Sequence, residues 1–199
     1  LTKIGVFLGL VIYVGVLGYF SVLRHNAFWS SYDLANMDQT VWQTSRGRIF
    51  QLTGEQGLES RFGHHADLIL VLITPLYWLL SDPRALLWLQ SLALGTGGVL
   101  VFLIGKKILK KSWLALGVSV LYWINPGLWW TNIYDFHAIV LAVPLILGMV
   151  SFKLNGRWKL AFGLSLLALL TKENTGLWLA VWWGVEWLKT KKLKDLAVG

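Results

Sequence analysis

The chain has 199 residues, of which 56% are hydrophobic and only 14% are charged; its mean hydropathy is +0.59 and it contains 13 tryptophans. Soluble domains carry about 25% charged residues, so this composition excludes an ordinary soluble globular protein and indicates an integral membrane protein. The net charge of +8 comes from short clusters of cations between apolar runs rather than from one basic face, which excludes nucleic acid as a partner. The chain has no cysteine, so disulfides, thiolate zinc sites and cysteine nucleophiles are excluded as well.

Four apolar runs are predicted to cross the membrane, since a helix needs about 20 apolar residues to do so. Residues 4–23 and 85–104 reach that length. Residues 113–133 also qualify, with Asn125-Pro126-Gly127 as an internal kink, and 138–152 are shorter but nearly continuous. The first run is too long for a signal-peptide core and lacks a small-residue cleavage site, so we expect it to be retained.

Two further apolar segments do not fit a simple crossing. Because 85–104 already supplies the crossing that the orientation needs, 68–80 is predicted to be a short or re-entrant helix on the outer side. Residues 160–188 are interrupted by polar residues 171–176. They favour a hairpin of two short helices with Lys172 and Glu173 at its tip. The alternative, a single span, would bury both charges in mid-membrane.

Three basic clusters indicate the orientation, because cations gather on cytoplasmic loops. Placing all three clusters inside puts the N-terminus in the cytoplasm and the loop 25–66 outside. The fold class expected is therefore an all-α integral membrane protein, a polytopic helical bundle forming a single transmembrane domain over 1–199. Because the chain starts at Leu1 rather than Met, we expect it to be part of a longer protein. The clusters are Lys106, Lys107, Lys110 and Lys111; Lys153, Arg157 and Lys159; and Lys189, Lys191, Lys192 and Lys194.

The outer loop contains a predicted amphipathic helix over Leu34–Arg46. Asp33 can cap its N-terminus by accepting a backbone N–H, and Gly47 can close its C-terminus. At 100° per residue, one apolar stripe is formed by Leu34, Met37 and Val41. This pattern is typical of a helix lying in the membrane interface or on the outer ends of the spans.

The two carboxylates of this helix each have a plain and a functional interpretation. Asp33 is either a helix cap or a reactive group. Asp38 projects about 40° from Leu34, at the edge of the apolar stripe, where an ordinary surface charge is not expected. It either forms an ion pair with an arginine (Arg46, Arg48 or Arg61) or takes part in function.

Other ionisable residues are predicted on the same outer side of the membrane. His64 and His65 are either an ordinary interfacial pair or a weak metal-site candidate, because no third ligand is fixed by spacing. The remaining residues either cap turns and pair internally or serve function; they are Asp135, His137, Lys172 and Glu173. Together these groups suit a reaction on a lipid-linked phosphate, since a carboxylate can deprotonate an acceptor hydroxyl and cations can neutralise a leaving phosphate.

An ordered series of short motifs resembles a known family over nearly the whole chain. The motifs are Tyr32-Asp33-Leu34, Met37-Asp38-Gln39, Val41-Trp42, Gly47, Gly63-His64-His65, Thr74-Pro75-Leu76-Tyr77, Leu89-Gln90, Asp135-Phe136-His137 and Lys172-Glu173-Asn174. The chain thereby resembles the domain of unknown function 2079 family of bacterial multispanning membrane proteins. That family in turn looks like part of the GT-C glycosyltransferase superfamily, whose members have a first span, a long extracytoplasmic loop and an amphipathic juxtamembrane helix.

The resemblance implies roles for particular residues. Asp33 matches the acid after the first span and would be the general base. Asp38 matches a second acid, which could orient the acceptor or help to hold a divalent cation. The turn Asp135-Phe136-His137 resembles a second acidic site facing the same cavity, and Lys172 resembles a lysine near the lipid phosphate. Which of the adjacent histidines is the principal one of its motif stays open, as does any metal requirement.

The resemblance also implies a function. The expected activity is transfer of a sugar from a polyprenyl-phosphate donor to an acceptor on the extracytoplasmic face of the bacterial inner membrane, with membrane lipids as the other partner. Two alternatives remain at this point. One is a transporter or channel component in which Lys172, Glu173 and Asp135 line a polar pathway. The other is a non-catalytic membrane scaffold whose carboxylates act only as caps and ion pairs.

Overall fold

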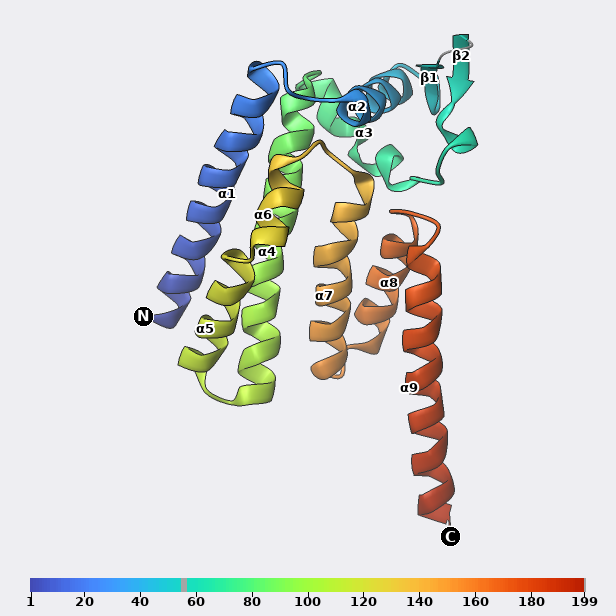
Figure 1. Ribbon diagram of the computed structural model, residues 1–199. Coiled ribbons are helices and arrows are strands. Elements are labelled where there is room, and N and C mark those ends of the chain that lie inside the picture. The colour runs from blue at the N-terminus through green and yellow to red at the C-terminus, as the bar shows by residue number, and fades with distance from the viewer. Residues whose placement is uncertain (55–56, 199) are drawn as a thin grey trace.

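The computed structural model describes residues 1–54 and 57–198, and their side chains except those of residues 58 and 191–198. The described chain is almost entirely helical (Figure 1). Two helices, α1 (Thr2–Asn26) and α4 (Pro83–Leu109), are long and apolar enough to cross a membrane. The shorter helices are α2 (Tyr32–Ser45), α3 (Ile69–Leu79), α5 (Ser112–Trp123), α6 (Pro126–Ile133), α7 (Ala142–Leu154) and α8 (Trp158–Leu169); α9 spans Thr175–Val198, and η2 (Ala138–Leu141) is a 3-10 turn leading into α7.

Helix α4 is the centre of the bundle and packs against α1, α5 and α7. Its contact with α5 is close because Gly98 has no side chain: a Cβ there would lie 2.2 Å from the Trp123 ring. The indole nitrogen of Trp123 donates to the Gly95 carbonyl at 2.9 Å, and Ser119 donates to the Gly98 carbonyl. Small residues and side-chain hydrogen bonds are the usual means by which apolar helices hold together without a hydrophobic driving force.

The two ends of the bundle differ in character. Helices α2 and α3 and the strands β1 (Gln51–Gly54) and β2 (Gly57–Ser60) lie together at one end, which we call the α2 end (Figure 1). The α4–α5 and α7–α8 connections and the C-terminal part of α9 lie at the other end (Figure 1). The first two predicted basic clusters are on these two connections. Of the third cluster, residues 191, 192 and 194 lie outside the described side chains.

Two apolar stretches differ in detail from the sequence expectation. Residues 113–133 do not form one kinked helix; they form α5 and α6, because Pro126 starts a new helix and the Asn125 side chain caps it, accepting from the Gly127 and Leu128 amides. Residues 160–188 correspond to α8 and the first part of α9, which run side by side and are joined at the α2 end (Figure 1).

The loop between α1 and α3 is more ordered than the sequence indicates. After α2 the chain forms a two-stranded antiparallel hairpin, in which Gln51 pairs with Ser60 and Gly54 with Gly57. This hairpin is absent from the sequence prediction, because strands of four residues leave almost no periodic signal. It is tied to α2 by Gln39, whose amide both donates to and accepts from Thr53. A 3-10 turn, η1 (Arg61–Gly63), then leads the chain back toward α3.

The predicted apolar stripe of α2 is confirmed. Leu34, Met37 and Val41 are 2%, 4% and 0% exposed and belong to one core cluster with residues of α3 and α4. The predicted closure at Gly47 is also confirmed: Gly47 has a φ of +82°, and its amide and that of Arg48 bond back to the carbonyls of Thr44 and Gln43.

The predicted cap of α2 is wrong. The helix starts one residue before Asp33, and the N-cap position is Ser31, which makes no side-chain cap hydrogen bond of its own. Instead, the carboxylate of Asp135, about a hundred residues later in the chain, accepts from the Ser31 amide at 2.7 Å and from the Leu34 amide at 3.3 Å. Asp33 therefore lies in the first turn of α2, and its carboxylate does not cap the helix.

Candidate functional site

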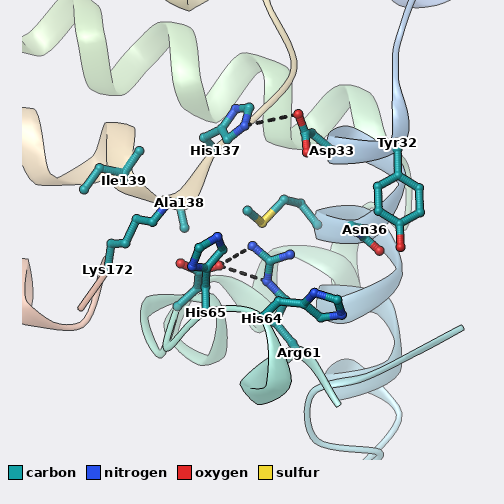
Figure 2. A pocket seen from close by; sticks show the side chains of 12 residues that line it. Tyr32, Asp33, Asn36, Arg61, His64, His65, His137, Ala138, Ile139 and Lys172 are labelled. Atoms are coloured by element: carbon teal, nitrogen blue, oxygen red, sulfur yellow. Dashed lines mark hydrogen bonds and ion pairs between the residues drawn. The ribbon is translucent and has the colours of Figure 1, made fainter. Parts of the chain in front are cut away.

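A pocket of about 220 Å³ opens at the α2 end, and we call it the Asp33 pocket. Four segments far apart in the sequence form its walls: α2, the η1 loop, η2 and the α8–α9 loop (Figure 2). Its lining combines cationic, imidazole and carboxylate groups with a few apolar atoms. The lining residues are Tyr32, Asp33, Asn36, Met37, Arg61, His64, His65, Asp67, His137, Ala138, Ile139 and Lys172.

Asp33 and His137 face each other across the pocket (Figure 2). An Asp33 carboxylate oxygen lies 3.5 Å from His137 Nε2. The other ring nitrogen, Nδ1, lies 2.9 Å from the Asp135 carbonyl oxygen, which can only accept, so Nδ1 carries a proton. An ion pair with Asp33 therefore requires a second proton on Nε2.

The turn that carries His137 is held by buried groups. The Gln90 side chain of α4, which is 0% exposed, donates to the Thr131 and Asn132 carbonyls, both at 3.1 Å, and accepts from the His137 amide. The Tyr134 ring stacks on the His137 ring with centroids 5.8 Å apart. The position of the imidazole is therefore held by the hydrogen bond to the His137 amide and by the stacked Tyr134 ring.

Asp135 does not line the Asp33 pocket. It is 0% exposed, and both of its oxygens are engaged: one accepts from Arg24 at 2.7 Å and the other from the Ser31 hydroxyl at 2.5 Å, besides the amides at the start of α2. Burial opposes ionisation, but the hydrogen bonds from Ser31 and Arg24 outweigh it and hold the pKa of Asp135 below its usual value. The expectation of a second acid facing the cavity is thus not met. Asp135 instead joins the end of α1, the start of α2 and the turn before η2.

The α8–α9 loop contributes a carboxylate and a cation with different partners. Glu173 accepts from His65 Nδ1 at 2.9 Å and from the Ala66 amide at 3.2 Å. Hydrogen bonds from its own backbone amide, from His65 and from Ala66 lower the pKa of Glu173 to about 2. Lys172 is half-buried and lines the pocket, yet its side chain makes no hydrogen bond or ion pair with any described residue. The internal pair Lys172–Glu173 considered from the sequence is therefore absent among the described contacts.

A buried ion pair forms part of the pocket wall, where Arg61 lies beside His64 and His65 (Figure 2). Arg61 and Asp67 are 6% and 1% exposed, and the guanidinium donates to Asp67 through Nε at 2.9 Å and Nη2 at 2.5 Å. Nη1 has no described partner. Sequence reasoning treated Arg61 only as a possible partner of Asp38 and missed Asp67. The signal available was the pair's six-residue spacing across the Gly63-His64-His65 motif, which alone does not predict burial.

Asp38 lies on the other side of α2. It lines a separate and more open hollow of about 560 Å³, which we call the Asp38 hollow, together with Tyr32, Ala35, Asn36, Gln39, Trp42, Thr53 and Ser81. Its partner is the Tyr77 hydroxyl at 2.5 Å. The arginine pairs considered from the sequence are wrong, because the guanidinium groups of Arg46 and Arg48 lie over the Trp42 ring, 5.5 and 5.3 Å from its centroid, and Arg61 binds Asp67.

Three imidazoles surround the Asp33 pocket, and each faces a different carboxylate. His137 faces Asp33, His65 faces Glu173, and His64 lies 3.2 Å from Glu59. This dispersal separates potential metal ligands: among the side chains that the structure describes, no group of three or more His, Asp or Glu residues could hold a metal ion together.

The structure thus brings together most of the predicted site residues. Asp33, His64, His65, His137 and Lys172 line one pocket, and Glu173 holds one of its histidines. Asp38 and Asp135 lie outside it. Sequence reasoning missed Tyr32, Asn36, Arg61 and Asp67 as lining residues, and Gln90 as the group that holds the His137 turn.

Comparison with known families gives one result. Residues 24–197 match the DUF2079 family, described as predicted membrane proteins, and the chain belongs to this family. No curated protein and no solved structure matches the chain.

Proposed function

We propose that this member of a family of predicted membrane proteins is a glycosyltransferase of the GT-C type, which moves a sugar from a polyprenyl-phosphate carrier to an acceptor on the extracytoplasmic face of the bacterial inner membrane. The observation that carries the proposal is the Asp33 pocket, where the Asp33 carboxylate and His137 face each other and Lys172, which has no described side-chain partner, lines the same cavity. Alongside it stand the family match and the order of motifs in the chain.

The proposed topology is a polytopic bundle with a cytoplasmic N-terminus. The α4–α5 and α7–α8 connections, which carry the first two basic clusters, lie at the end opposite α2 (Figure 1), and α2 contributes a wall of the Asp33 pocket. Since Lys and Arg gather on cytoplasmic loops, this arrangement supports an extracytoplasmic position for the pocket.

The pocket has the charges that the departure of a lipid phosphate requires. In the proposed reaction the acceptor oxygen attacks the anomeric carbon of the sugar, and the bond from that carbon to the phosphate oxygen breaks. The polyprenyl phosphate then leaves with the bonding electrons as an additional negative charge. Lys172 Nζ and Arg61 Nη1, both without described partners, are the donors that would bind that charge. Fixed cations in a partly dry pocket stabilise developing charge without reorganisation.

Asp33 is the proposed base. Its carboxylate takes the proton of the acceptor hydroxyl, and His137, 3.5 Å away, steadies the carboxylate before transfer. A positioned base of this kind contributes about 10²–10⁴-fold to a rate.

The hydrocarbon part of the donor also has a place to lie. A mostly apolar hollow of about 380 Å³ is lined by residues of α4, α5, α6, η2 and α7. Ile139 lines both this hollow and the Asp33 pocket. A donor with its phosphate at Lys172 could therefore extend its isoprenoid chain past Ile139 between α6 and α7. This adjacency favours a lipid-linked donor over a free sugar nucleotide.

The test is incubation of the full-length protein, reconstituted in vesicles, with labelled polyprenyl-phosphate sugars. Release of free polyprenyl phosphate by wild-type protein is the expected result. If no lipid phosphate is released from any donor and a labelled solute crosses the vesicle membrane instead, the transporter alternative replaces this proposal. If neither occurs, the scaffold alternative does.

A further inference from the structure

The Asp38 hollow contains a carboxylate that is only partly satisfied by the described residues. Of its lining residues, only Asp38 is charged. One of its carboxylate oxygens accepts from Tyr77, and the other has no described partner. Burial raises the pKa of Asp38, so the site favours a ligand that donates a hydrogen bond to this carboxylate.

A second polar group in the hollow is also unpaired. Asn36 is only 6% exposed, yet its side-chain amide makes no hydrogen bond with any described residue. Its amide atoms are not enclosed and reach the surface of the hollow, so a ligand that supplies a donor or an acceptor can bond to them directly. Asn36 is labelled in Figure 2, on the α2 wall of the neighbouring Asp33 pocket.

We infer that the Asp38 hollow is the acceptor subsite and binds an uncharged saccharide through its hydroxyl groups, with Asp38 and Asn36 as the polar contacts and Tyr32 as the exposed aromatic wall. This inference rests on the proposed glycosyl transfer and adds the location and chemical class of the acceptor.

The lining favours a neutral saccharide over other acceptors. A phosphorylated or carboxylated acceptor would meet the Asp38 carboxylate with no lining cation to offset the repulsion. The guanidinium groups of Arg46 and Arg48 lie over the Trp42 ring and compete with a sugar for it. The Tyr32 ring, which is 59% exposed, is the more open aromatic surface.

The position also fits transfer between two sites. Tyr32 and Asn36 line both the Asp38 hollow and the Asp33 pocket. They are four residues apart and therefore neighbours on one face of α2. A saccharide held at Asp38 could reach across this edge with one hydroxyl toward Asp33, which is the proposed base.

The test is saturation-transfer NMR on the detergent-solubilised full-length protein with two probes, methyl α-glucoside and glucose 6-phosphate. The expected result is binding of the neutral glycoside and not of the phosphate ester. Asp38→Asn keeps the side-chain shape and an acceptor for Tyr77 but loses the charge, and it should raise the dissociation constant of the glycoside about tenfold. Ala35→Trp fills the hollow from an exposed position and should abolish binding without removing any contact.

Lys107→Gln is the control: it removes one charge at an exposed position near the far end of α4, outside both hollows, and should leave glycoside binding unchanged. Equal binding of glucose 6-phosphate, absence of glycoside binding by the wild type, or wild-type binding by both Asp38→Asn and Ala35→Trp overturns the inference. Failure of the transferase proposal looks different: the wild type would then release no lipid phosphate from labelled donors, whatever the glycoside result.

Discussion

The two hollows on either side of α2 share two lining residues but differ in charge. The Asp33 pocket has Lys172, Arg61 and three histidines in its walls, whereas the Asp38 hollow is lined by one carboxylate and uncharged side chains. The first is suited to an anion, and the second is suited to hydroxyl groups. The comparison shows that one amphipathic helix can present two sites of different chemistry.

Helix geometry explains the separation. Asp33 and Asp38 are five residues apart, which places them about 140° from each other around α2. Leu34, Met37 and Val41 lie on the buried stripe and hold the helix down. The two carboxylates therefore face away from each other and cannot act on the same atom.

The largest difference between the two hollows is expected when the Asp33 carboxylate is removed. We expect Asp33→Asn to lower transfer about 10²–10⁴-fold, because the acceptor hydroxyl loses its base. The measurement is release of polyprenyl phosphate from a labelled donor, with membrane insertion checked by fractionation. Wild-type turnover by the inserted variant would remove Asp33 from the chemistry.

The next largest effect is expected at Lys172. Replacement by methionine keeps most of the side-chain volume but removes the charge that offsets the leaving phosphate, and we expect turnover to fall about 10²-fold. Lys172→Arg restores the charge and should recover part of the activity. Equal turnover by the methionine and arginine variants would show that the charge at this position is not used.

A substitution of Asp135 tests the contacts that hold the start of α2, the helix that both hollows share. Asp135→Asn leaves the partly buried Arg24 without its ion pair and weakens the acceptor at the start of α2, so we expect a loss of about 2 kcal/mol of folding stability. Thermal unfolding of the detergent-solubilised protein measures it. An unchanged melting temperature would contradict the role of Asp135 in joining α1, α2 and the turn before η2.

The same residue predicts a pH dependence. Because the pKa of Asp135 is lowered in the fold, its stabilisation is fully present above the usual aspartate pKa of about 3.9 and is lost as the pH falls through the lowered value. The melting temperature of the wild type should therefore drop more steeply than that of Asp135→Asn on acidification below about pH 4. If the melting temperatures of the wild type and of Asp135→Asn fell in parallel with pH, the stabilising role of the Asp135 carboxylate would be contradicted.

The smallest effect is expected from Asp38→Asn when water is the acceptor. Release of lipid phosphate without added saccharide should stay within about twofold of the wild type, since the anion site and the base lie on the other side of α2. If release of lipid phosphate fell as far as in Asp33→Asn, the two hollows would have to act as a single site.

Much of the α2 end could be predicted from the sequence because its signals are local. The stripe of Leu34, Met37 and Val41 follows helical periodicity, and Gly47 has the left-handed conformation that glycine adopts most readily. The long apolar runs likewise predicted α1 and α4.

The features that the sequence did not predict depend on contacts between distant segments. The cap of α2 comes from Asp135, which local spacing cannot indicate. The buried pair Arg61–Asp67 and the role of Gln90 arise only once η1 and the turn before η2 are folded against their neighbours. Whether Asp33 and Asp38 share a cavity depended on which elements cover each face of α2.

The central claim is that the lipid phosphate binds in the Asp33 pocket and not in the Asp38 hollow. Since the chain has no cysteine, single cysteines can report on each site by thiol labelling. Ile139→Cys lies in the wall of the Asp33 pocket, and Ala35→Cys lies in that of the Asp38 hollow. We predict that added polyprenyl phosphate slows labelling of Ile139→Cys and leaves that of Ala35→Cys unchanged. Protection of Ala35→Cys alone, or of neither variant, would contradict the account.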